Sequence, residues 1–266
     1  MALRLGASVY AAFFAGRDRD SWPTLAHAVR SIRELDERLG VEIWATRDID
    51  DPGPTPAEER EITAAGRGAP FTSLHARGRC WTWDPAGLRR EIDLAERLGA
   101  RTLVVHPGTL GLDGLLGSPD VPEIHRLLDH ARRRRIALAL ENTVDSLRVL
   151  DRALDIAEDD SAFGICIDVG HAAQSHDAGR HPVRAYIERY RGRVIHLHLH
   201  DTMGLEDDHS VPGRGIVDWS DFRRALRDIG YDGPAVLEVV PGRSLSTNAS
   251  PEELLREAIS FLSSVA

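Results

Sequence analysis

Three histidines alternate with aliphatic residues between positions 194 and 200. The segment reads VIHLHLH, so that His196, His198 and His200 occupy every second position. Because side chains alternate between the two faces of a strand, all three imidazoles are expected on one face. A buried imidazole needs a partner for its ring nitrogens, which a metal ion, a substrate or an acid would provide. The pattern indicates either a strand that lines a functional site or a strand with core or solvated histidines.

Metal-ligating residue types also end the other strand-like segments. Six consecutive segments end in such a residue: His75, His106, Glu141, Asp168, His198 and Glu238. The intervening loops add three more candidates: His171, Asp207 and His209. Each residue alone has a structural interpretation, such as a helix cap or a turn. Together, so many carboxylates and imidazoles would repel one another or lack partners unless cations neutralised them.

The mixture of carboxylate and imidazole ligands favours particular metals. Calcium prefers sites made only of oxygen, whereas manganese, zinc, iron and cobalt accept both ligand types. We therefore expect a divalent metal cofactor, either Mn, Zn, Co or Fe.

Eight short apolar segments alternate with longer amphipathic segments along the chain. The predicted strands are 3–10, 41–44, 71–75, 102–106, 137–141, 163–168, 194–198 and 235–238. The predicted helices lie near 22–39, 56–65, 85–98, 119–134, 146–157, 183–190, 219–229 and 251–265. Thr55 and Ser250 each precede a proline and a glutamate at capping-box spacing. Eight βα units without a linker predict one (β/α)8 TIM barrel over residues 1–266, whose strand ends converge on one rim.

Composition limits the class of protein. The net charge of −9 over 266 residues argues against broad nucleic-acid binding. Cys80 and Cys166 provide no disulfide framework, and no segment reaches the length of a transmembrane helix. The apolar start resembles a signal peptide, but Arg4 and Gly6 interrupt it within the first predicted strand. We expect a cytoplasmic protein without a membrane partner, and leave open whether it forms a homo-oligomer.

The motifs together resemble the xylose isomerase-like TIM-barrel superfamily, which contains sugar phosphate isomerases and epimerases as well as endonuclease IV. The motifs are LENT at 140–143, IDVGH at 167–171, HLHD at 198–201, the loop 207–215, and LE at 237–238. The resemblance implies that the single-metal site of the ketose epimerases corresponds to Glu141, Asp168, His198 and Glu238. It implies that the further ligands of a three-metal site correspond to His75, His106, His171, Asp207 and His209. We expect one ion, with up to three as the alternative.

The resemblance also implies a reaction. It favours a metal-dependent isomerase or epimerase of a small carbohydrate-like substrate, a sugar, sugar phosphate or polyol-like compound. Glu141 and Glu238 would transfer a proton on opposite faces of a metal-stabilised ene-diolate, and His171 would hold a substrate oxygen. Further candidates for substrate binding are Trp81, Trp83, Arg214 and His200. His196 is expected one layer deeper in the barrel and not as a ligand.

Two alternatives remain open at this stage. The complete set of nine ligands also matches an endonuclease IV-like phosphodiesterase with several metals, which would cut nucleic acid at abasic sites. Arg77, Arg79 and Trp81 could then contact DNA, although the second strand, VEIW, resembles the sugar-isomerase branch. The other alternative is a non-catalytic barrel that retained its metal ligands.

Overall fold

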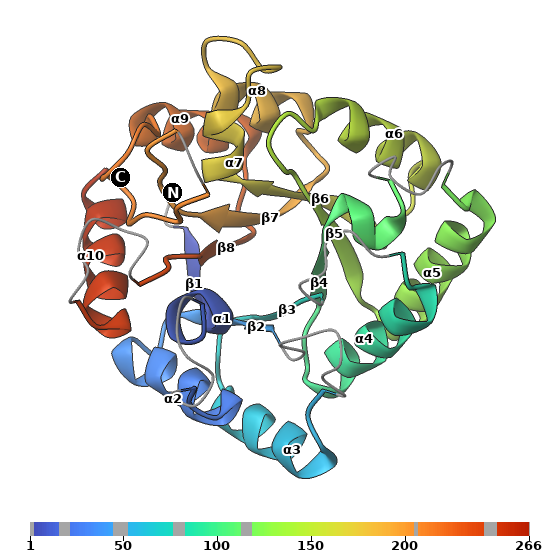
Figure 1. The fold of residues 1–266 in the computed structure, drawn as a ribbon, viewed down its shortest axis with the longest axis horizontal. Helices are drawn as coiled ribbons and strands as arrows, with labels where there is room; N and C mark the ends of the chain where they lie inside the picture. Colours follow the sequence, from blue (N-terminus) through green and yellow to red (C-terminus); the bar gives the residue numbers. More distant parts are fainter. Residues whose placement is uncertain are drawn as a thin grey trace.

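Eight parallel strands close into a barrel in the order β1 to β8 (Figure 1). The computed structural model describes residues 3–15, 22–44, 53–76, 83–112, 119–204, 207–241 and 249–265. The strands are β1 (Arg4–Ser8), β2 (Gly40–Trp44), β3 (Thr72–His75), β4 (Thr102–Val105), β5 (Ala137–Glu141), β6 (Phe163–Asp168), β7 (Val194–Leu199) and β8 (Pro234–Leu237). The predicted (β/α)8 barrel is confirmed.

Helices surround the barrel and cover the outer face of the strands (Figure 1). They are α2 (Leu25–Leu35), α3 (Pro56–Ala65), α4 (Pro85–Arg97), α5 (Val121–Arg134), α6 (Leu147–Ala157), α8 (Pro182–Arg189), α9 (Trp219–Ile229) and α10 (Pro251–Ser264). Both predicted capping boxes are present, at Thr55 with Glu58 and at Ser250 with Glu253. These caps satisfy amide groups that the first turn of a helix leaves without partners.

Three short helical segments follow strand ends directly and were not predicted. They are α1 (Val9–Phe13), η2 (Pro107–Leu110) and α7 (Val169–Gln174). The first strand ends at Ser8 rather than at residue 10, because the Ser8 hydroxyl accepts a hydrogen bond from the amide of Ala11 and starts α1. Short polar side chains compete in this way with strand hydrogen bonding. All three segments start at the rim where the strands end.

The two faces of the strands build different interiors. Outward-facing residues such as Leu138 and Leu140 are fully buried in one large apolar core against the helices. Inside the barrel, Val104, Ala139 and Cys166 form a small separate cluster. Other inner positions, such as those of Glu42, Ser73 and His196, carry buried polar groups below the rim.

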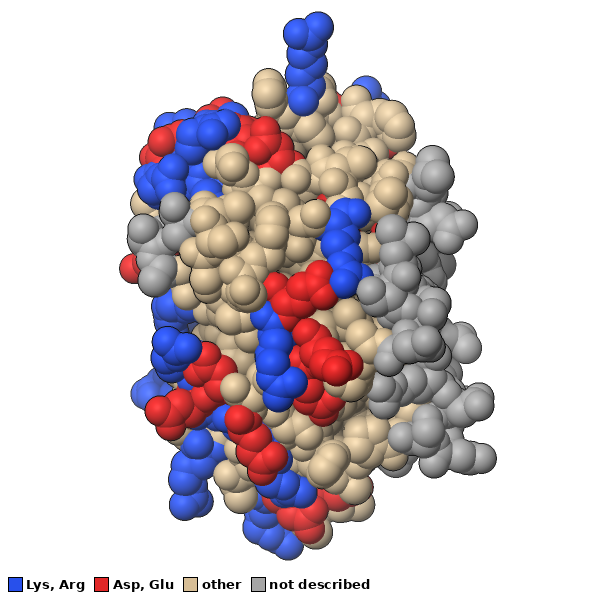
Figure 2. Space-filling model, turned by 90° about the vertical axis from the view of Figure 1, so that its left-hand side faces the viewer, with Lys and Arg blue, Asp and Glu red and all other residues tan. Residues whose placement is uncertain are grey.

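Charged side chains of opposite sign lie next to one another on the outside of the barrel. Figure 2 shows this for one side of the molecule, where arginines border acidic residues. Elsewhere Arg97 of α4 pairs with Glu59 of α3, and Arg189 of α8 pairs with Asp151 of α6. Such exposed pairs contribute little each, about 0–1 kcal/mol. Within the described part of the chain, no helix combines the length and the apolar composition that a bilayer-spanning segment requires.

Candidate metal centre

Four ligand-type side chains converge where β5 to β8 end. Glu141, Asp168, His198 and Glu238 each offer one atom, and these atoms lie within 4.8 Å of one another. Nδ1 of His198 is 3.2 Å from Oε1 of Glu141, 3.4 Å from Oε2 of Glu238 and 4.0 Å from Oδ2 of Asp168. All four side chains are buried. We call this group the central cluster.

The pairing of β6 with β7 and the side chain of Asn142 hold the central cluster in place. Asp168 pairs with His198 across β6 and β7, so both side chains reach the same height in the barrel. The side chain of Asn142 accepts from the backbone amide of Asp168 at 2.7 Å and donates to its carbonyl oxygen at 3.1 Å. The ends of β5 and β6 are therefore tied together beside the ligands.

Glu141 also contacts two further predicted ligands. Its Oε2 lies 3.2 Å from Nε2 of His75 and 3.0 Å from Nε2 of His106. Its Oε1 faces His198 of the central cluster instead. The carboxylate thus links His75 and His106 to the central cluster, as a ligand shared between two metals would.

A second group, the rim cluster, lies at the mouth of the barrel. His171, His200, Asp207 and His209 offer atoms within 4.8 Å of one another. Oδ1 of Asp207 is 3.2 Å from Nε2 of His171 and 2.9 Å from Nε2 of His209. The structure therefore brings all nine predicted ligands close together. They lie in the central cluster, in the rim cluster, or, for His75 and His106, against Glu141.

His200, which the sequence suggested for substrate binding, is buried behind Asp168. Its Nε2 lies 2.9 and 3.1 Å from the two carboxylate oxygens of Asp168. The ring passes over Gly170, where an added Cβ would be 2.0 Å from its Cε1 atom. The glycine of the IDVGH motif is thus needed for the close approach of this ring.

Four histidine rings share an arrangement in which Nε2 needs either a proton or a metal ion. In each of them Nδ1 lies 2.8–3.0 Å from a backbone carbonyl oxygen, and this holds for His75, His171, His200 and His209. A carbonyl oxygen only accepts, so Nδ1 carries the proton and a neutral ring has its lone pair on Nε2. That lone pair points at a carboxylate in every case. Two lone pairs face each other stably only with a proton or a metal ion between them.

The side chains present fit a divalent metal. Burial lowers the pKa of His75, which favours the neutral ring that a metal needs. Despite burial, the charge of Asp168 raises the pKa of His171 to about 10 and also raises that of His200, so a metal would have to displace a proton from these two rings. A ring with Nδ1–H on a carbonyl and Nε2 toward the site is the usual geometry of a metal-ligating histidine. Mixed carboxylate and imidazole donors suit zinc, manganese, iron or cobalt.

Electrostatics differ among the carboxylates of the central cluster. Burial opposes ionisation of Asp168, but the imidazoles of His171 and His200 lower the pKa of its carboxyl to about 2. Burial likewise acts on Glu141, yet His198 and His106 hold its pKa well below the usual range. Burial raises the pKa of Glu238 to about 7. Its buried Oε1 has no hydrogen-bond partner among the described residues. Both carboxylate oxygens of Glu141, in contrast, contact histidine nitrogens.

The other predicted substrate residues lie elsewhere or outside the described chain. The guanidinium of Arg214 forms a two-pronged ion pair with Glu257 of α10, at 2.7 and 2.6 Å. Trp83 packs over Gly111 and against the apolar core. Trp81, like Arg77 and Arg79, falls outside the described residues. Substrate contacts by Trp81, Trp83 and Arg214 stay predictions.

The sequence reasoning missed Glu42 in the middle of β2. Its carboxylate is fully buried inside the barrel, with Oε2 2.9 Å from both Nε2 of His196 and Oγ of Ser73. Its Oε1 lies 3.1 Å from Nε2 of His198. Strand alternation could have revealed it, because Val41 and Ile43 flank it and face outward. His196 lies one layer deeper than His198, as predicted, since it pairs in register with Cys166.

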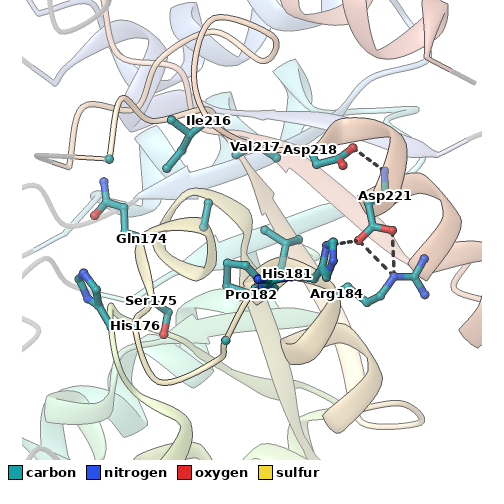
Figure 3. Close-up of a pocket in the computed structure, with 15 residues that line it drawn as sticks. Gln174, Ser175, His176, His181, Pro182, Arg184, Ile216, Val217, Asp218 and Asp221 are labelled. Carbon is teal, nitrogen blue, oxygen red and sulfur yellow. Dashed lines mark hydrogen bonds and ion pairs between the residues drawn. The ribbon is translucent and has the colours of Figure 1, made fainter.

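A cavity of about 410 Å³ lies beside the loops that carry the rim cluster (Figure 3). Its lining includes Gln174, His176, His181, Arg184, Ile216 and Asp218. Gln174 follows His171 by three residues on α7, and its side-chain amide donates to the hydroxyl of Thr202. The cavity therefore adjoins the segments after β6 and β7 that hold His171 and His200.

The barrel and its rim of ligands agree with a family match over the whole chain. The model of the xylose isomerase-like TIM barrel family matches residues 1–265, and the chain belongs to this family. The chain is 29% identical over 192 residues to uncharacterized protein MJ1311 of Methanocaldococcus jannaschii, covering 66% of this chain and 62% of that protein. It is 31% identical over 144 residues to probable endonuclease 4 of Thermoplasma acidophilum, covering 48% and 49%.

Solved structures show the same fold. D-psicose 3-epimerase of Clostridium cellulolyticum H10, solved with D-tagatose, superposes with a TM-score of 0.73 at 17% identity, covering 99% of each chain. The first curated relatives are matched over only 49% to 62% of their own length.

Proposed function

We propose that this protein is a metal-dependent isomerase or epimerase of a small carbohydrate-like substrate. The observation that carries the proposal is the position of Glu141 and Glu238. They come from β5 and from the end of β8, and approach Nδ1 of His198 to 3.2 and 3.4 Å. Two carboxylates that face one metal position from different strands can serve the two faces of a bound substrate.

A divalent ion held by the central cluster would supply Lewis acidity and make a C–H bond next to a substrate carbonyl more acidic. Glu238 would face the site with Oε2 and move a proton with its free Oε1. Glu141 would exchange the proton on the other face through Oε2, the oxygen that His75 and His106 contact, and His198 and His106 keep its pKa low. His171, on α7 at the rim, would orient a substrate oxygen. The burial of these groups excludes bulk water and protects a carbanion-like intermediate from unspecific protonation.

A ketose is the substrate class that this chemistry fits. The carbonyl and an adjacent hydroxyl place an acidic C–H between two oxygens that a Lewis acid can hold. The fold neighbour named D-psicose 3-epimerase was solved with the ketose D-tagatose. The cavity beside the rim cluster would leave room for the more distant part of a longer substrate.

Exchange of substrate hydrogen with solvent tests the proposal. We expect protein loaded with Mn or Co to incorporate deuterium next to the carbonyl of at least one ketose or sugar phosphate in D₂O. Glu238→Gln should slow this exchange by roughly 10²–10⁴-fold, since it removes the free carboxylate oxygen. NMR or mass spectrometry measures the incorporation. Absence of exchange across a broad panel of ketoses and their phosphates would contradict the proposal.

A second candidate is hydrolysis of a phosphodiester. The observation that favours it is the pair His75 and His106 on Glu141, together with the rim cluster. Metals about 3.5–4 Å apart can activate water and stabilise both oxygens of an in-line displacement. The positive charge of three divalent ions would exceed the negative charge of the four carboxylates, which favours binding of a phosphate. With one ion the site would keep a net negative charge, which suits a neutral sugar. Cleavage of an abasic-site duplex by protein with several ions would support this candidate.

A further inference from the structure

His198 differs from the other rings around the metal centre. Its Nδ1, rather than Nε2, faces Glu141, Asp168 and Glu238. Its Nε2 points down into the barrel, 3.1 Å from Oε1 of Glu42. A neutral imidazole carries one proton and one lone pair, so one of its two nitrogens must hold the proton. The side on which the proton lies decides whether His198 can serve as a ligand.

Glu42 is held firmly below this ring. Its Oε2 accepts hydrogen bonds from the hydroxyl of Ser73 and from Nε2–H of His196, each at 2.9 Å. These two contacts leave Oε1 directed toward His198. Glu42, His196 and His198 are all fully buried, so water cannot substitute for the carboxylate. The pair Oε1 and Nε2 lies within ion-pair distance, although its alignment falls outside that of a hydrogen bond.

We propose that Glu42 is a positioning residue of the metal centre, which keeps the proton of His198 on Nε2 and thereby directs the lone pair of Nδ1 toward the central cluster. The negative charge of Glu42 attracts the N–H side of the ring through a medium of low polarity. A carboxylate behind a ligating histidine fixes its tautomer and makes it a stronger ligand. His75, His171, His200 and His209 have their tautomer fixed by backbone carbonyls instead. This inference rests on the metal centre of the proposed function.

Glu42→Gln separates this role from a purely structural one. The amide keeps the shape of the side chain but removes its charge. We expect the dissociation constant for Zn or Mn to rise roughly 10–100-fold. The metal-free variant should still unfold in one cooperative transition, because the amide oxygen of Gln can accept the hydrogen bonds of Ser73 and His196. Calorimetric titration and thermal unfolding measure the two effects.

The matched control is Glu91→Gln. Glu91 is another buried glutamate, but it lies on α4 outside the barrel. This variant should bind metal like wild type. A metal affinity of Glu42→Gln within twofold of wild type would overturn the proposal, and so would equal losses in both variants.

A measurement on the wild-type chain covers the case in which Glu42→Gln fails to fold. In zinc-loaded protein with ¹⁵N-labelled histidine, long-range ¹H–¹⁵N spectra report the tautomer of each ring. His198 should show a proton on Nε2 and a metal-shifted Nδ1, whereas the opposite assignment would overturn the role of Glu42. Wild-type protein that binds no metal would refute the proposed metal centre itself. Normal binding with an unaffected Glu42→Gln would refute only the positioning role.

Discussion

At the scale of single residues, His198 is the side chain on which the central cluster depends most. Its Nδ1 faces the carboxylates of Glu141, Asp168 and Glu238, and its Nε2 lies next to the carboxylate of Glu42. His196 lies below it and contacts the other carboxylate oxygen of Glu42, Oε2. The two histidines are chemically identical and two positions apart, so they form a natural pair for testing which ring ligates.

Substitution should separate the two rings. We expect Asp168→Ala and His198→Ala to lower the metal content of the purified protein at least about tenfold, because each removes a ligand of the central cluster. His196→Ala should retain its metal, with an affinity weakened only by the loosened Glu42. Elemental analysis after gel filtration measures the content. Loss of metal in His196→Ala but not in His198→Ala would show that the wrong nitrogen donors have been assigned.

Metal affinity should depend on pH in a defined direction. The raised pKa of Glu238, about 7, means that its carboxyl is protonated below that pH in the metal-free protein. A metal ion must displace this proton as well as that of His198, whose pKa the surrounding carboxylates raise well above its usual value despite burial, so affinity should fall by about tenfold or more per pH unit below pH 7. Titrations in buffers of different ionisation enthalpy measure the protons released. Constant affinity between pH 5 and 7 would place Glu238 outside the ligand set.

Gly170 provides a test of the close packing around Asp168. A Cβ there would collide with the buried ring of His200, so we expect Gly170→Ala to destabilise the protein by about 1–3 kcal/mol. Gly66→Ala is the matched control, since its Cβ would approach nothing closer than 3.5 Å, and should change stability by less than about 0.5 kcal/mol. Urea denaturation compares them. Equal stability of both variants would contradict the packing described.

At the scale of elements, the ends of the strands bring together candidate ligands that lie far apart in the sequence. Alternation within β5 and β7 made the inward side chains predictable, and the capping signals located α3 and α10. Helices α1 and α7 escaped prediction because segments of five or six residues are too short to show a helical period. Asp168, a proposed ligand, also caps α7, because its Oδ1 accepts a hydrogen bond from the amide of His171 at 2.7 Å.

The capping boxes stabilise helices far from the chemistry. Thr55→Ala removes the hydroxyl that accepts from the amide of Glu58. We expect a loss of about 1 kcal/mol in unfolding free energy, and unchanged metal affinity. Chemical denaturation and metal titration of the same preparation measure both quantities. A change in metal affinity would mean that α3 communicates with the rim in a way the structure does not explain.

At the scale of the whole molecule, the chain is a single barrel whose interior is polar toward the rim. Residue types at strand ends and in the following loops indicated the nine candidate ligands, and the barrel geometry brings these side chains together; their role as ligands stays a prediction. Glu42 was missed because its partner His196 lies 154 residues further along the chain and its other partner, Ser73 on the neighbouring strand, looks unremarkable in sequence. The number of metal ions could not be predicted, because shared ligands such as Glu141 fit one ion as well as several.

Metal stoichiometry is the most direct test of the account. Elemental analysis of protein purified without chelators should give close to one divalent ion per chain, and His198→Ala should remove it. Two or three ions per chain, held also by His75, His106 and the rim cluster, would contradict the mononuclear isomerase. Cleavage of an abasic-site duplex by that species would then identify a phosphodiesterase instead.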